Sequence, residues 1–150
     1  MVKYLPGVFL DLYPTHRNMQ KLKYYLPRVI AALIMLQTLY FKFGLGGAEA
    51  LQESKNLFGE VTQFLLGSSD LEWLVRISTG IGELLASILL FVPKLSKWGA
   101  LLTMGVMFGA VISHLLILGI VVADDGGFLF GMAVTALICG VFAYLVPNNQ

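Results

Sequence analysis

Four long apolar segments dominate the pattern of the chain, at about 26–45, 72–92, 98–123 and 128–146. Each holds close to the ~20 residues that an α-helix needs to cross a hydrocarbon core of ~30 Å. The spacing therefore predicts an all-α protein, a four-helix transmembrane bundle. In the third segment Gly109 and Ser113 are one helical turn apart, and such a small-residue pair predicts a close approach of two membrane helices.

Residues 46–70, between the first two segments, carry a shorter pattern of another kind. Apolar residues recur there at i, i+4, i+7 and i+8, which is one face of a helix: Leu57, Val61, Phe64 and Leu65. Glycines precede and follow this stripe. We expect an extracytoplasmic amphipathic helix between helices 1 and 2, serving either as a passive interfacial element or as a lid over the bundle.

Composition agrees with a membrane protein, because 57% of the residues are hydrophobic and 13% are charged. A soluble domain of 150 residues could not bury so much apolar surface. The net charge of +1 gives no indication of a nucleic-acid partner. The one cysteine, Cys139, excludes an intrachain disulfide and a Cys-x-x-Cys redox pair.

Basic residues predict how the chain is oriented. Lys21, Lys23 and Arg28 precede or open the first segment, and Lys94 and Lys97 lie between the second and third. Because basic loops stay on the cytoplasmic side, we expect a multi-pass protein of the cell (inner) membrane with both termini cytoplasmic. The domains expected are 1–25, a cytoplasmic interfacial segment in contact with membrane lipids, and 26–146, the transmembrane domain.

Two charged residues lie inside the second apolar segment. Arg76 and Glu83 are seven residues apart, two helical turns on one face, and Gly80 and Ser87 share that face. Lipid cannot solvate such a face, so other helices must cover it. The two charges are too far apart for direct contact along the helix, but a third group could bridge them.

Polar residues of three predicted helices fall in the outer half of the membrane or near its middle: Gln37, Tyr40, Lys42, Arg76, Glu83 and His114. This layer predicts a polar pocket that opens outward. Glu83 and His114 are the candidate catalytic residues, because a carboxylate and an imidazole can pass protons. Arg76, Lys42, Tyr40 and Gln37 are the candidate cofactor-binding residues, for a quinone carbonyl or an anionic head group.

A purely structural role remains an alternative for these residues. Lys42 and Arg28 could extend to the head groups on either side. Arg76, Glu83 and His114 could form a hydrogen-bond network that only sets helix register. One histidine and one carboxylate do not make a metal site, so no metal is expected.

Two stretches resemble the DoxX-like family of membrane proteins. LPRVIAALIML followed by FKFG is similar to the family's first helix, and GELLASILLFVPKLSKWGALLTMG to its second helix, basic turn and third helix. The resemblance covers residues 26–146. The positions that match characteristic polar residues of the family are Arg28, Lys42, Glu83 and His114. Ala86-Ser87 stand where small glycines often follow the glutamate. The resemblance implies a four-helix bundle, with relatives linked to thiosulfate:quinone oxidoreduction, membrane redox-stress complexes or lipid handling.

The function expected is therefore a redox-associated membrane subunit that binds a quinone-like lipophile in an outer-leaflet polar pocket. Any enzymatic activity would be that of a subunit of a quinone-linked oxidoreductase, with a redox partner protein or a homo-oligomer as its partner. A binder or carrier of lipid or of a small hydrophobic solute, gated by the amphipathic helix, is the first alternative. A membrane scaffold with a structural polar network is the second.

Overall fold

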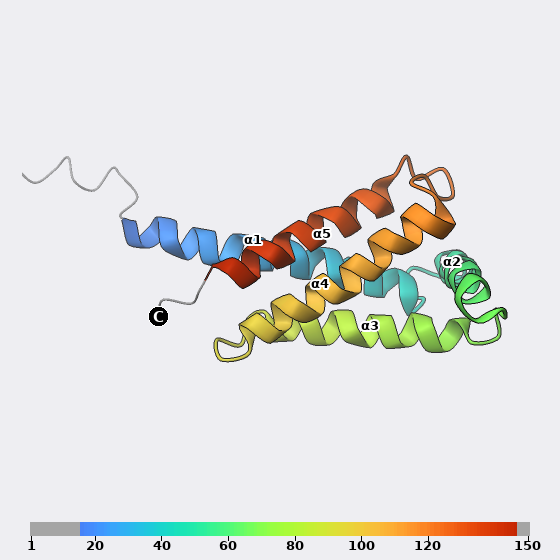
Figure 1. Ribbon diagram of the computed structural model, residues 1–150, viewed down its shortest axis with the longest axis horizontal. Coiled ribbons are helices and arrows are strands. Elements are labelled where there is room, and N and C mark those ends of the chain that lie inside the picture. Colours follow the sequence, from blue (N-terminus) through green and yellow to red (C-terminus); the bar gives the residue numbers. More distant parts are fainter. Residues whose placement is uncertain (1–15, 147–150) are drawn as a thin grey trace, which may run out of the picture.

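The computed structural model describes residues 16–146, and its regular elements in that range are all helical (Figure 1). They are α1 (His16–Lys42), α2 (Ala48–Leu66), α3 (Glu72–Leu89), α4 (Ser96–Ser113), the π-helical turn η1 (His114–Leu118) and α5 (Phe128–Leu145). The expectation of an all-α fold is confirmed.

Helices α1, α3, α4 and α5 lie together as a bundle. α1 packs against α3 and α5, and α4 packs against the same two helices. α3 and α4 meet at their connecting turn and diverge away from it (Figure 1). α2 lies across the wide end, where α1 ends and α5 begins, and it contacts α1, α3 and η1. The amphipathic segment thus forms a helix that covers one end of the bundle.

Three helical stretches in the described range are long and apolar enough to cross a membrane: Met19–Lys42, Ser96–Leu118 and Phe128–Leu145. Large apolar side chains also remain outside the bundle, with Leu33 62% and Leu116 66% exposed. Soluble proteins rarely leave extended apolar surfaces in water. Both observations indicate a membrane protein. α3 is not among the three stretches, and its 18 residues include Glu72, Arg76 and Glu83.

Small residues let the helices of the bundle approach one another. The closest approach is at Gly99, where an added Cβ would lie 2.5 Å from the backbone nitrogen of Leu90. A Cβ at Gly109 would meet nothing within 4 Å, so no helix of the described residues packs closely against Gly109. Gly109 instead borders open space. The centre of the bundle is formed by fully buried small and medium side chains: Ala31, Met35, Ala86, Leu90, Ala100, Ala136 and Ala143.

The first helix begins earlier than the apolar pattern predicts. α1 starts at His16, so residues 16–25 of the expected interfacial segment continue directly into the membrane helix, and Pro27 lies in its interior. Tertiary contacts hold the helical turn before Pro27, because Tyr24 is buried and its hydroxyl lies 3.4 Å from Ser96 Oγ. The rest of that segment, residues 1–15, lies outside the described residues.

The third apolar segment ends as a helix at Leu118, five residues before its predicted end. Gly119 follows with φ +84°, a backbone conformation that side chains with a Cβ rarely adopt. Asp125 then starts α5: its carboxylate accepts hydrogen bonds from the backbone N–H groups of Leu129, Val122 and Gly127 at 2.8, 3.0 and 2.8 Å. These bonds hold the pKa of Asp125 below its usual range, and the bond from Leu129 has the largest effect.

Candidate functional site

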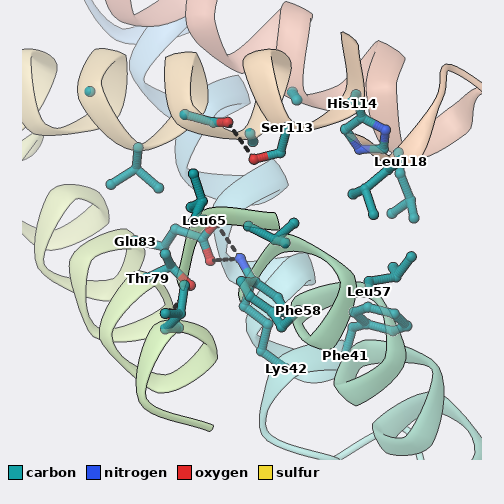
Figure 2. A pocket seen from close by; sticks show the side chains of 18 residues that line it. Phe41, Lys42, Leu57, Phe58, Leu65, Thr79, Glu83, Ser113, His114 and Leu118 are labelled. Carbon is teal, nitrogen blue, oxygen red and sulfur yellow. Dashed lines mark hydrogen bonds and ion pairs between the residues drawn. The ribbon is translucent and has the colours of Figure 1, made fainter. Parts of the chain in front are cut away.

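Lys42 ends α1 and is directed at α3. Its Nζ lies 2.5 Å from Oε1 and 2.6 Å from Oε2 of Glu83 (Figure 2). Thr38, one turn earlier on the same face of α1, brings its hydroxyl to 2.9 Å from Oε2. Lys42 is 8% and Glu83 2% exposed. The interpretation of Lys42 as a side chain extended to the head groups is therefore wrong, because a buried carboxylate holds its ammonium group.

Arg76 is connected to the same pair through the backbone. Its Nη1 donates to the carbonyl oxygen of Lys42, and its Nε lies 3.0 Å from Oε2 of Glu72, one turn earlier in α3. The last carbonyls of a helix have no partner inside the helix, so Arg76 satisfies one of them at the end of α1. Lys42 is the third group that links Arg76 to Glu83, through its backbone carbonyl and its side chain.

A cavity of about 350 Å³ lies between α3, α4 and α2, with the Lys42–Glu83 pair in its wall (Figure 2). An apolar cavity of ~150 Å³ holds a benzene molecule, so this one has room for a substituted ring. Apolar and small side chains make up most of its wall: Phe41, Leu57, Phe58, Val61, Leu65, Val75, Val106, Gly105, Gly109, Ala110, Leu118, Leu129 and Ala133. Few polar groups reach it, so a ligand there would be largely apolar.

His114 borders the same cavity from the other side, where α4 gives way to η1 (Figure 2). Its Nδ1 lies 2.9 Å from the carbonyl oxygen of Gly119, and its own carbonyl accepts the N–H of Gly119 at 2.8 Å. π-helical turns occur frequently at functional sites. Here the turn and the two bonds to Gly119 fix the imidazole, which is 7% exposed, at the cavity wall.

His114 and Glu83 thus share one cavity, and within residues 16–146 they make no direct hydrogen bond to each other. Arg76 does not border the cavity. The structural network expected from Arg76, Glu83 and His114 therefore exists only in part, with Lys42 and not His114 as the third member.

Two predicted site residues point elsewhere. Tyr40 is 56% exposed and Gln37 is also exposed, and neither borders the cavity. At 3.6 residues per turn, they lie about 140° to 160° around α1 from Lys42. The prediction rested on depth in the membrane, which does not indicate the face of the helix on which a residue lies. Thr38, the residue overlooked, was detectable from its i, i+4 spacing to Lys42.

Arg28, near the middle of α1, forms a second buried polar cluster beside the C-terminal end of α5. It is 1% exposed, so the expectation that it extends to the head groups is wrong. Its Nη2 donates to the carbonyl oxygens of Ala143 at 2.6 Å and Val146 at 3.2 Å, and its guanidinium lies 3.6 Å from the ring centre of Tyr24. The positive charge thereby caps the C-terminal end of α5, where the helix dipole is negative.

Within the described residues, His, Cys, Asp and Glu side chains form no group of three or more that could hold a metal ion. Cys139 is buried in α5. No protein-family model, no curated protein and no solved structure matches the chain. The function must therefore be inferred from the cavity and its polar groups.

Proposed function

We propose that this membrane protein binds one small lipophile with a polar head, of the size and chemistry of a quinone, in the cavity between α2, α3 and α4. A single observation carries the proposal: an apolar cavity of about 350 Å³ with Lys42, Glu83 and His114 in its wall. Ligand sites of this kind combine an apolar lining with a few fixed polar groups. The apolar wall would hold the ring or tail, and the polar groups would orient the head.

As part of this proposal, α3 is a fourth membrane span. Its charged side chains are paired inside the bundle, Glu83 with Lys42 and Arg76 with Glu72, which removes most of the penalty of placing them in lipid. Its outer face is apolar, with Ile81 49% and Ile88 54% exposed.

The orientation with cytoplasmic termini is supported by the positions of basic residues. The start of α1 and the turn between α3 and α4 lie at the same end of the bundle (Figure 1). The exposed Lys21 and Lys23 lie near the start of α1. Lys94 lies in the turn between α3 and α4, and Lys97 in the first turn of α4, and both are exposed. On the positive-inside rule this end is cytoplasmic, and the cavity end faces the outside of the cell (inner) membrane.

Membership of the DoxX-like family is also proposed. The four residues that carry the resemblance, Arg28, Lys42, Glu83 and His114, are 1%, 8%, 2% and 7% exposed. Polar groups buried in a membrane bundle are expensive and are kept for structure or function. Their shared burial supports the idea that these positions form a common structural and ligand-binding framework.

A redox role would use the ligand as the electron carrier. With a single cysteine, the chain has no dithiol of its own, so a partner protein or a second copy would supply or accept the electrons. Glu83 and His114, the candidate catalytic residues, border the cavity and would exchange the protons that accompany reduction of a quinone.

The proposal is tested by mass spectrometry of lipophiles that the gently purified protein retains. Gly109→Leu would place a side chain into the cavity without moving the backbone, because a Cβ there meets nothing within 4 Å. Gly131→Leu is the matched control: a Cβ at Gly131 is equally free, and Gly131 does not border the cavity.

We expect a quinone-like lipophile in the wild type and in Gly131→Leu, and its loss in Gly109→Leu. Glu83→Gln should also lower retention. Equal retention by all variants, or no lipophile in any of them, would contradict binding in this cavity. If the variants are less stable but their folded fraction still binds the same partner proteins as the wild type, the protein is a scaffold instead.

One observation favours a second candidate, a carrier of lipid or of a small hydrophobic solute. α2 supplies four apolar residues of the cavity wall, so its movement would open or close the cavity: Leu57, Phe58, Val61 and Leu65. A disulfide between α2 and α3 would lock it. Blocked flux of a retained lipid in the oxidised form, restored on reduction, would favour the carrier, whereas unchanged flux would count against it.

A further inference from the structure

The charges in the cavity wall offset each other. Lys42 and Glu83 are the charged residues that border the cavity among the described residues, and each is the other's partner. An anionic or cationic ligand would add an unpaired charge to an apolar cavity, which is unfavourable. An uncharged head group leaves this balance undisturbed. The charge pattern therefore selects against fatty acids and amines.

The hydrogen bonding of His114 determines what kind of uncharged head group it can bind. A carbonyl oxygen only accepts hydrogen bonds, so Nδ1, at 2.9 Å from the oxygen of Gly119, must carry the proton. In the neutral imidazole, Nε2 then has a lone pair and no proton. Within residues 16–146 Nε2 has no hydrogen-bond partner, and it is not among the fully enclosed atoms without one. It is therefore available as an acceptor at the cavity wall.

Resting on the proposed function, we infer that the cavity selects an uncharged lipophile with a hydroxyl group, whose O–H donates to Nε2 of His114. An oxidised quinone has only acceptors and cannot make this bond, whereas a hydroquinone, a phenol or an alcohol can. For a quinone couple, the protein therefore binds the reduced form more tightly. His114 is the residue that determines this preference.

The test compares three probes that share one apolar tail: para-nonylphenol, its methyl ether para-nonylanisole, and para-nonylbenzoate. Their binding to the full-length protein in lipid nanodiscs is measured by equilibrium dialysis, with empty nanodiscs as the blank. For the wild type we expect the phenol to bind about tenfold more tightly than the ether, the contribution of one hydrogen bond to a buried acceptor. The benzoate should bind more weakly than the phenol.

Two variants separate a ligand contact from a structural role of His114. In His114→Asn the amide nitrogen can replace Nδ1 and keep the bond to Gly119, but no acceptor remains at the position of Nε2. The variant should bind the phenol and the ether about equally, because the hydrogen bond to the hydroxyl is lost. In His114→Gln the longer side chain can place its amide oxygen near Nε2, and part of the preference should return.

Each outcome separates this inference from the proposed function. If the wild type binds the phenol and the ether equally, hydroxyl selection is wrong and the cavity remains a lipophile site. If His114→Asn keeps the full preference, another group accepts the hydroxyl and the assignment to His114 is wrong. If the benzoate binds as tightly as the phenol, selection for an uncharged head group is wrong. If none of the probes binds, both proposals are wrong. Should His114→Asn fail to fold, the wild-type ratio still decides hydroxyl selection, and a preference unchanged in His114→Gln would contradict the role of His114.

Discussion

The Lys42–Glu83 ion pair gives the sharpest quantitative prediction, because both partners are almost completely buried. Lys42→Met would leave the carboxylate of Glu83, 2% exposed, with only the hydroxyl of Thr38 near it. Glu83→Gln would leave the ammonium group without a counter-charge. Breaking a buried pair by removing one partner typically lowers the free energy of unfolding by about 3 kcal/mol or more.

The double variant Lys42→Met/Glu83→Gln removes both charges and should be more stable than either single variant. We expect it to lie within about 1 kcal/mol of the wild type, since replacing a whole buried pair is often neutral. The resulting coupling energy would be several times the average of about 0.6 kcal/mol for a hydrogen bond between membrane helices. That excess separates a charge pair from an ordinary interhelical contact.

Reversible unfolding in mixed micelles, titrated with a denaturing detergent and followed by tryptophan fluorescence, measures these values. Lys97→Met is the control, because Lys97 is exposed in the first turn of α4 and its loss should have little effect. If the two single losses simply add in the double variant, or if the coupling stays near 0.6 kcal/mol, the reasoning about a buried, mutually dependent pair is wrong.

Three further predictions concern other parts of the fold. Arg28→Met should lower the free energy of unfolding by about 2 kcal/mol in the same titration, because carbonyls at the end of α5 lose their donor; full stability would refute the capping role. Gly99→Ala should destabilise by about 2 kcal/mol through backbone overlap, whereas Gly105→Ala, with nothing within 4 Å of its Cβ, should not. Because the pKa of Asp125 is lowered in the folded state, its capping bonds stabilise the fold at pH values above the unfolded-state pKa of about 3.9. This stabilisation is lost as the pH falls through the lower pKa of the folded state. Thermal unfolding against pH should show this loss, and Asp125→Asn should reduce it; an unchanged acid profile would contradict the assignment.

Much of the fold follows from local pattern. The helices of the apolar segments, the helix Ala48–Leu66 and the glycine turns around Asp125 depend on neighbouring residues, so they are predictable from the sequence. The polar face of α3 was predictable for the same reason: Arg76, Gly80, Glu83 and Ser87 repeat at helical spacing, and all of them are buried. The sequence also allowed for a group that bridges Arg76 and Glu83, because two helical turns separate them.

The partners across helices were decided by tertiary structure. α1 is apolar around much of its circumference, so its sequence does not indicate which face turns inward, and Thr38 rather than Gln37 or Tyr40 meets Glu83. That rotation is set by close packing against α3 and α5. The proton position on His114 depends on Gly119, which η1 brings to the ring. Periodicity specifies positions within one helix, whereas cavities and ion pairs depend on how several helices are rotated against one another.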